Sequence, residues 1–390
     1  MKKRLISMIL ATSMLAVSLT GCGNINSDKD TQNDKKDLEK ITFVLDWTPN
    51  TNHTGLYVAQ EKGYFEEAGL DVEIVQSPED SSVVLVGSGK AQFGISFQDS
   101  LAPALSGEDA IPVTAVAGII QHNTSGIISR KGEGMDTPKG MEGHTYATWN
   151  GAIELATLEQ VVTADGGEFE KVELIPSTVT DEVSALKTNS VDSIWIFYAW
   201  AGVKTELEKL ETDYFAFADL DPVFDYYTPI IIGNNDFLKE KPETAKAFMQ
   251  AVRKGYTFAI ENPKEAADIL CKAAPELDKT LVTASQEYLA NEYQADAPYW
   301  GYIDAERWNN FYQWVNDNHL TEEEVPEDLI KNSNVFHFGT LSMTHEGVRA
   351  ATKKALDIAK KSGCIISFDP TLRPPLWDSL ETAKEQVLYG

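Results

Sequence analysis

Apolar and polar residues follow two distinct periodicities in the first part of the chain, one typical of strands and one typical of a helix. Residues 41–45 form a short run rich in apolar and β-branched side chains, and residues 70–75 alternate apolar and polar, which is typical of strands. Between them, residues 55–62 follow a helical pattern that ends at Gly63. Strands separated by a helix indicate a βαβ unit and therefore a parallel sheet.

A helix–turn–strand pattern occurs twice in the chain. The first copy covers residues 81–96 and the second covers residues 181–196. In each copy, a helical run, a turn-forming triplet and a strand-like run follow one another. The similarity is too weak for a repeat of fixed period, but it fits two lobes that are built to one plan.

Two segments look like passages between such lobes. In residues 118–130 a polar stretch is flanked by apolar runs, and residues 228–233 form a second apolar run with a proline. Amphipathic helices are expected at residues 242–260, 263–274 and 304–316. We therefore predict an α/β fold of two lobes joined by two hinge strands. Its cleft can close by hinge motion and holds ligand at the carboxyl ends of the strands.

Composition narrows the function classes. The 390 residues are 43% hydrophobic, enough for a large core and for two or three domains, and the formal net charge is −27. This charge argues against nucleic acid as a partner and disfavours a highly anionic ligand. Cys271 and Cys364 show no disulfide framework, and no cluster suggests a metal, so we expect no cofactor.

The N-terminus has the features of an export signal. Residues 1–21 begin with a basic stretch and continue with an apolar run too short for a membrane span. They lead to Leu-Thr-Gly-Cys at residues 19–22, which resembles the lipobox of bacterial lipoproteins. The resemblance implies lipid attachment at Cys22, on the extracytoplasmic face of the cell membrane. An ordinary secretory signal that happens to contain a cysteine is the alternative. Residues 22–40 are polar and predict a flexible tether.

One long motif carries a family resemblance. Residues 45–59 (LDWTPNTNHTGLYVA), followed in register by residues 63–65 and 87–95, resemble the ThiY-like binding proteins of ABC importers. That superfamily also contains eukaryotic thiamine-pyrimidine synthases, and the resemblance covers about residues 41–330. It implies a type II periplasmic-binding-protein fold and capture of a pyrimidine precursor of thiamine, such as a formylaminopyrimidine. It also implies an ABC permease and its ATPase subunits as partners.

The two passages divide the chain into its expected domains. We expect lobe 1 to consist of residues 41–122 and 233–330, and lobe 2 of residues 123–232. Residues 331–390 would then form a separate C-terminal βαβ-like fragment.

A flat heteroaromatic ligand needs aromatic faces and a few neutral polar groups. On the family motif and at the predicted strand ends, ten residues offer these groups. They are Trp47, Asn50, Asn52, His53, Tyr57, Gln98, Asn123, Asn150, Tyr198 and Trp200. We expect Trp47, Asn50 and Tyr198 to share one opening, and Trp149 is a further candidate face.

Several of these residues have structural alternatives. Trp47 and Asn50 could shape a turn, and His53 could satisfy the start of the following helix. Tyr57 could belong to the core, and Asn123 could be a hinge residue.

The chain departs from the family pattern in two places. The synthases carry a cysteine-rich iron motif where residues 148–154 of this chain contain no cysteine. Synthase activity is therefore unsupported, although His53 aligns with a histidine that the enzymes use. Ala201 stands where the pyrimidine binders have an acidic residue, and losing such a partner typically costs about 1–3 kcal/mol. A different pyrimidine or a flavin stays open as the ligand, and Glu154 is a candidate substitute for the missing carboxylate.

The C-terminal residues resemble a different family. Residues 334–344 and 365–377 are similar to an internal piece of fructokinase-like sugar kinases of the ribokinase family. Their pattern predicts a strand, a helix over residues 347–361, a strand and a helix. The family's catalytic Gly-Ala-Gly-Asp run is absent, and so small a fragment cannot bury a full core, so we expect no kinase activity. We interpret residues 331–390 as a fusion artefact; a genuine appended module is the alternative.

Overall fold

The structure is a computed structural model. It describes residues 38–390 except 77–80, 107–109, 177–178, 180, 322–329, 345, 371–376, 378 and 390. The predicted signal peptide, the proposed lipid site Cys22 and most of the tether lie outside the described residues. Among the helices in the described ranges, none is both long enough and apolar enough to cross a membrane.

The first sheet is mixed and has the strand order β2-β1-β3-β10-β4. β1 (Glu39–Leu45) runs parallel to β2 (Leu70–Gln76) and to β3 (Phe93–Ser96). β10 (Ile230–Asn234) is antiparallel to both β3 and β4 (Val113–Gly118). The chain therefore leaves this sheet after β4 and returns to it more than a hundred residues later as an inner strand.

The second sheet repeats this plan with the strand order β7-β6-β8-β5-β9. β6 (Thr145–Thr148) is parallel to β7 (Glu173–Pro176) and β8 (Ser193–Phe197). β5 (Ser125–Arg130) is antiparallel to β8 and β9 (Thr212–Ala216). β10 and β5 are the strands that the chain forms when it enters each sheet from the other one, and both occupy the fourth position in their sheet.

The two helix–turn–strand copies predicted from sequence are confirmed. The first consists of α3 (Ser82–Gly87) and β3, and the second of α6 (Glu182–Lys187) and β8. β3 and β8 occupy the same central place in their sheets. Equivalent residues at the ends of these strands are therefore expected to have equivalent roles.

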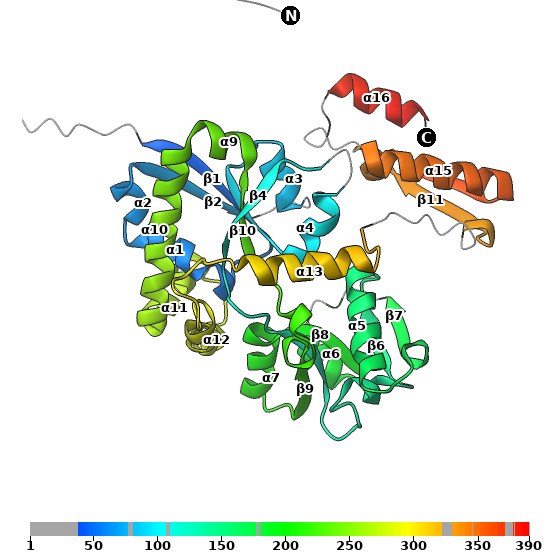
Figure 1. Ribbon diagram of the computed structural model, residues 1–390, viewed down its shortest axis with the longest axis horizontal. Coiled ribbons are helices and arrows are strands. Elements are labelled where there is room, and N and C mark those ends of the chain that lie inside the picture. The colour runs from blue at the N-terminus through cyan, green and yellow to red at the C-terminus, as the bar shows by residue number, and fades with distance from the viewer. Residues whose placement is uncertain are drawn as a thin grey trace, which may run out of the picture. The chain divides into compact units, whose positions relative to one another are not determined.

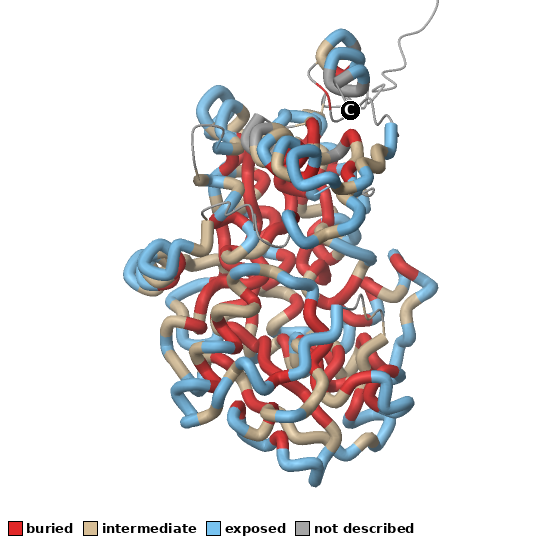
Figure 2. The backbone as a smooth tube through the Cα atoms, turned by 90° about the vertical axis from the view of Figure 1, so that its right-hand side faces the viewer, coloured by how far each residue is buried: buried red, intermediate tan, exposed pale blue. Residues whose placement is uncertain are grey.

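Helices cover the first sheet and complete its core. They are α1 (Thr54–Glu61), α2 (Tyr64–Glu67), α4 (Gln98–Ala104), α9 (Asn235–Glu240), α10 (Pro242–Glu261), α11 (Pro263–Ala273) and α12 (Lys279–Glu292). α10 runs alongside the sheet (Figure 1) and stacks Phe248 on Phe93 of β3, with ring centroids 4.3 Å apart. α1 and α10 approach so closely that a Cβ atom on Gly255 would lie 2.0 Å from the carbonyl oxygen of Gly55. Figure 2 shows buried residues running through the interior, with exposed residues mostly on the outside.

The second sheet carries α5 (Ala152–Ala164), α7 (Val203–Leu207) and α8 (Phe217–Leu220), and β8 continues into the π-helical turn η4 (Tyr198–Gly202). Two passages, residues 119–124 and 217–229, link the sheets. Asp225 in the second passage bonds His122 in the first, with 2.7 Å between Oδ2 and Nδ1. Arg307 of α13 (Ala305–Asp317) donates to the same carboxylate oxygen over 3.0 Å. The sheet memberships agree with two lobes, whereas the lobe boundaries at residues 122/123 and 232/233 stay a prediction.

The C-terminal segment has the predicted order of elements. β11 (Val335–Gly339) and β12 (Ile365–Asp369) form a two-stranded parallel sheet, with α15 (Glu346–Ser362) between them in sequence and α16 (Leu380–Tyr389) after them. Its small core includes Phe338, Met343, Leu356 and Trp377. Val335 and Ile365 remain 52% and 67% exposed, as expected for a sheet too small to cover both faces.

Candidate ligand-binding site

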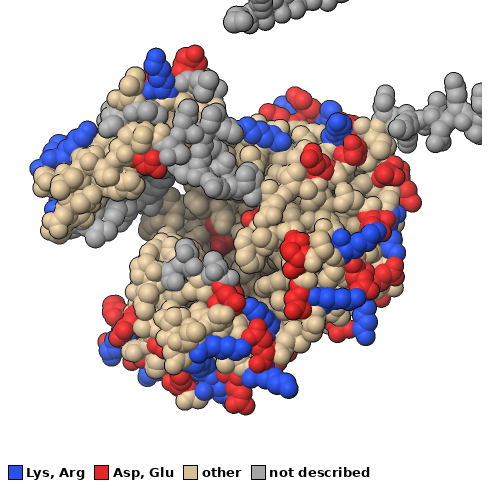
Figure 3. Space-filling view, turned by 180° about the vertical axis from the view of Figure 1, so that it is seen from behind, with Lys and Arg blue, Asp and Glu red and all other residues tan. Residues whose placement is uncertain are grey.

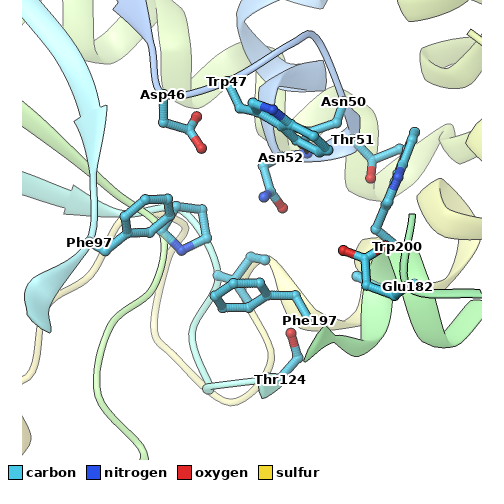
Figure 4. A pocket seen from close by; sticks show the side chains of 14 residues that line it. Asp46, Trp47, Asn50, Thr51, Asn52, Phe97, Thr124, Glu182, Phe197 and Trp200 are labelled. Carbon is cyan, nitrogen blue, oxygen red and sulfur yellow. Dashed lines mark hydrogen bonds between the residues drawn. The ribbon is translucent and has the colours of Figure 1, made fainter. Parts of the chain in front are cut away.

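A cavity of about 380 Å³ lies where the carboxyl ends of β1, β3 and β8 meet (Figure 4). This volume falls in the range of small-molecule sites. The cavity is lined by Asp46, Trp47, Asn50, Thr51, Asn52, Phe97, Ile120, Thr124, Glu182, Phe197, Ala199, Trp200, Ala201 and Pro229. Both sheets and both passages contribute to this set. A hinge motion between the sheets would change the shape of the cavity directly.

Four aromatic rings surround the cavity, one on each side in Figure 4. Trp47 and Phe97 follow strands of the first sheet, whereas Phe197 and Trp200 come from the end of β8 and from η4. The rings of Phe97 and Phe197 are nearly parallel, with centroids 6.4 Å apart and an angle of 18°. Trp47 is 52% exposed and Phe197 39% exposed. Large apolar rings left open to water at a shared cavity are typical of a site for a planar ligand.

The loop after β1 is held in shape by its own side chains. The side-chain oxygen of Asn50 accepts a hydrogen bond from the backbone nitrogen of Asn52 over 2.9 Å, which caps the short helix η1 (Thr51–His53). The backbone nitrogen of Asn50 donates to Nδ1 of His53 over 3.2 Å. Asn50 lines the cavity, but its amide mainly shapes the loop, as the turn alternative anticipated.

His53 is fully buried and acts on the cavity through a neighbour. Because Nδ1 accepts a backbone hydrogen bond, the ring proton is assigned to Nε2, which donates to Oδ1 of Asp46 over 2.8 Å. The imidazole therefore fixes the orientation of the Asp46 carboxylate, which lines the cavity. Both ring nitrogens are occupied by these two contacts. His53 therefore helps to close the start of η1, and its side chain makes no capping hydrogen bond to the following helix, α1.

Three further polar side chains face the cavity (Figure 4). Asn52 points its amide inward, and this amide has no hydrogen-bond partner among the described residues. Thr124 is only 7% exposed, and within the described part of the chain its Oγ1 is buried without a partner. Burial raises the pKa of Glu182; Asp181 adds to this rise, and Lys204 opposes it. The unsatisfied Thr124 hydroxyl is a group that a ligand would be expected to satisfy.

Of the ten residues predicted from sequence, the structure brings Trp47, Asn50, Asn52 and Trp200 together at the cavity. Gln98 and Asn123 lie elsewhere, because both are used to tie segments together. The side chain of Gln98 bonds the backbone of Tyr227 and of Trp308, each over 2.9 Å. Asn123 donates to the carbonyl of Phe224 over 2.8 Å and so joins the two passages, as the hinge alternative anticipated.

The other predicted residues also lie away from the cavity. Tyr57 packs against the core of the first sheet. Asn150 is exposed in a left-handed turn, with φ 60°, before α5. Tyr198 donates to Glu206 and packs against Tyr214 and Tyr288, with ring centroids 4.8 Å and 5.6 Å away. The expected trio is thereby divided, because Tyr198 lines a different groove from Trp47 and Asn50.

Glu154, the candidate substitute for the missing carboxylate, is occupied elsewhere. Its carboxylate is buried and accepts hydrogen bonds from the hydroxyl of Tyr146 over 2.7 Å and from the backbone nitrogen of Gly151 over 3.0 Å. It therefore caps α5. Trp149 is 53% exposed and lies outside the cavity.

Sequence reasoning missed several lining residues, and signals existed for three of them. Phe97 and Phe197 each precede a predicted residue by one position and stand at the end of the strand in each helix–turn–strand copy. Glu182 is the first residue of α6, the helix of the second copy. Comparing the two copies position by position would have identified the phenylalanine pair.

The described residues contain no group of three or more histidine, cysteine, aspartate and glutamate side chains placed to hold a metal ion. Two sheets of this topology, with a ligand-sized cavity between their strand ends, are typical of periplasmic-binding folds. The aliphatic sulphonate binding protein SsuA of Escherichia coli superposes with a TM-score of 0.56 at 12% identity, over 73% of this chain and 94% of that chain. This likeness establishes the type II periplasmic-binding-protein fold expected from sequence.

The chain belongs to the NMT1/THI5-like family, whose model matches residues 50–266. It is 29% identical to a formylaminopyrimidine-binding protein of Halalkalibacterium halodurans, over 83% of this chain and 96% of that protein. It is 26% identical to the 4-amino-5-hydroxymethyl-2-methylpyrimidine phosphate synthase THI13 of Saccharomyces cerevisiae, over 62% of this chain and 74% of that protein.

A separate likeness concerns a short stretch of the chain. Over 85 residues it is 46% identical to fructokinase-2 of Solanum lycopersicum, which covers 22% of this chain and only 26% of that enzyme. The resemblance to a fragment of a sugar kinase therefore stands, and it accounts for about a quarter of such an enzyme.

Proposed function

We propose that this chain is an extracytoplasmic solute-binding lipoprotein of an ABC importer and that it captures a thiamine pyrimidine precursor resembling formylaminopyrimidine. The observation that carries the proposal is the cavity itself. Four aromatic rings from both sheets surround a space sized for one small ring compound. The likeness to a formylaminopyrimidine-binding protein over most of both chains supports the same ligand class.

The geometry supports capture by closure. A planar ring enters between the strand ends and stacks on Trp47 and Trp200, while Asn52 and Thr124 supply neutral hydrogen bonds. Because these groups come from both sheets and from a passage, the ligand stabilises the closed form more than the open one. The permease, which works with its ATPase subunits, would then recognise the closed form.

The lipid anchor is part of this proposal. Cys22 would carry the lipid and residues 22–40 the tether. Labelling cells with radioactive palmitate tests the anchor: the wild type should incorporate label and a Cys22→Ala variant should not. Equal labelling of both would refute lipidation at this residue.

An enzyme of pyrimidine synthesis is the alternative from another class, since the family includes synthases. It would need His53 as a reactive group, yet both nitrogens of that ring are engaged with Asn50 and Asp46. A sugar kinase is suggested only by the C-terminal resemblance, which covers too little of such an enzyme.

Isothermal titration calorimetry of the full chain without its signal peptide tests the function. Formylaminopyrimidine should bind with one-to-one stoichiometry and raise the melting temperature. Thiamine and riboflavin serve as comparison ligands. If riboflavin alone binds, the ligand class changes to a flavin; if no ring compound binds, the proposal is wrong. Iron-dependent formation of a pyrimidine product by the purified protein would favour the synthase instead.

A further inference from the structure

Among the described residues that line the cavity, two have ionisable side chains, and both are carboxylic acids. Asp46 comes from the loop after β1 and Glu182 from the start of α6. In the part of the lining that the structure describes, there is no lysine, arginine or histidine. Figure 3 shows a face of the molecule that is hollowed, with acidic side chains visible around the hollow.

Both carboxylates face the cavity, and a hydrogen bond fixes that of Asp46. Asp46 is fixed by the Nε2 proton of His53 at 2.8 Å through one oxygen, and its other oxygen has no partner among the described residues. Glu182 has no ion pair among the described residues; the nearby ammonium group of Lys204 pairs with Asp181 over 2.9 Å and acts on Glu182 only as a neighbouring charge. In Figure 4 both carboxyl groups point toward the space between the aromatic rings.

An independent observation points to a ligand at the same place. The hydroxyl of Thr124 lines the cavity, is removed from water and has no partner within the described residues. A buried hydroxyl without a partner costs about 1–3 kcal/mol unless something satisfies it. Thr124 and Asn52 can donate or accept, whereas the two carboxylates accept when ionised, so the charged groups of the cavity favour an occupant with N–H donors and without negative charge.

We infer that Glu182 determines which ring the protein accepts: it receives a hydrogen bond from an amino group on the ring, opposite Asp46, and the two carboxylates exclude a phosphorylated ring. The inference rests on the proposed function and assigns the selective role to one residue. The selective residue therefore lies on α6. Ala201, which also lines the cavity, has no polar group that could take this role.

The inference also indicates which type of reaction must follow uptake of the ring. The yeast relatives are named for a pyrimidine phosphate. A phosphate group between these two carboxylates would be repelled on both sides of this cavity. The ring is therefore taken up without its phosphate, and a phosphotransferase reaction must follow import if the phosphorylated form is needed.

Binding of three related rings to the full chain tests the inference. They are 4-amino-5-hydroxymethyl-2-methylpyrimidine, its phosphate ester and its 4-oxo analogue, in which an acceptor replaces the amino donor. The variants are Glu182→Gln, which preserves shape but removes charge, and Glu182→Asp, which keeps the charge. Glu170→Gln is the matched control, because it removes the same charge at an exposed position outside the cavity. Calorimetry at constant ionic strength compares them, since screening alters long-range charge effects.

The wild type should bind the amino ring at least about tenfold more tightly than the 4-oxo ring and about 100-fold more tightly than the phosphate ester. Glu182→Gln should weaken the amino ring by about 10- to 100-fold and reduce the amino/oxo preference to under about threefold, because glutamine can donate to the oxo group. Glu182→Asp should keep the preference, and Glu170→Gln should behave as the wild type.

Two results would overturn the inference while leaving the proposed function intact. One is an unchanged amino/oxo preference in Glu182→Gln. The other is a phosphate ester that binds the wild type as tightly as the parent ring. If instead the wild type binds neither these rings nor formylaminopyrimidine, the proposed function itself fails.

Discussion

Trp47 offers a clean test of the aromatic cavity, because its ring is open to water in the free protein. It is 52% exposed and makes no aromatic ring contact among the described residues. Replacing Trp47 by alanine should therefore change stability by less than about 0.5 kcal/mol, the usual range for a surface substitution. The same change should remove one face of the binding site.

The expected loss of affinity follows from the exposed area. A tryptophan side chain carries up to about 250 Å² of surface, so a ligand that covers half of the exposed part removes about 65 Å² from water. At about 25 cal/mol per Å² this burial contributes about 1.6 kcal/mol, and stacking adds about 0.5–1.5 kcal/mol. A total of about 2–3 kcal/mol corresponds to a 30- to 150-fold increase in Kd.

Trp149→Ala is the matched control. Trp149 is 53% exposed, almost the same as Trp47, but lies outside the cavity. Calorimetric titration with formylaminopyrimidine, alongside melting curves, should show the loss for Trp47→Ala alone. If both variants bind as the wild type does, or if both lose affinity equally, the assignment of this cavity as the site is refuted.

Three further predictions concern the fold and its pH dependence. Gly255→Ala places a Cβ atom 2.0 Å from a backbone carbonyl oxygen of α1. The substitution should therefore destabilise the protein by about 1–3 kcal/mol, measured by urea unfolding. An unchanged urea midpoint would show that the two helices can separate freely. The pKa of His122 is raised to about 8, chiefly by its hydrogen bond to Asp225, so its stabilising contribution is complete below about pH 6.5 and is lost as the pH rises through about 8. His122→Gln should thus lower the free energy of unfolding by about 1 kcal/mol at pH 6 and leave it unchanged at pH 9. The value at pH 6 is already reduced because the His122 side chain is 39% exposed. Equal losses at both pH values would contradict the ion pair. Burial raises the pKa of Asp99 to about 6, so its ionisation destabilises the fold at higher pH. Asp99→Asn should therefore raise the free energy of unfolding by about 1–3 kcal/mol at pH 7 and not at pH 3.5, and a gain that did not depend on pH would exclude this cause.

The sequence predicted the architecture because that information is local and periodic. The alternation in residues 70–75 and the helical run before Gly63 are set by which side of each element faces the core. The two helix–turn–strand copies could be recognised for the same reason. The antiparallel insertion of β10 between β3 and β4 was not predicted, since pairing between distant segments leaves no local pattern.

The site was predicted less completely, because orientation at a strand end depends on a single residue. Gln98 and Tyr198 were chosen, yet their neighbours Phe97 and Phe197 face the cavity. Polar residues near a cleft can equally serve as internal ties, as Gln98 does toward the backbone of Tyr227. Glu182 gave no signal beyond its place at a helix start, and only the fold brings it opposite Asp46.

A crystal structure of the protein soaked with formylaminopyrimidine would test the central claim most directly. We predict density for one flat ring inside the space enclosed by Trp47, Phe97, Phe197 and Trp200, with a nitrogen within hydrogen-bond distance of Glu182. Density in the groove beside Tyr198, Tyr214 and Tyr288, with the predicted space left to solvent, would contradict it.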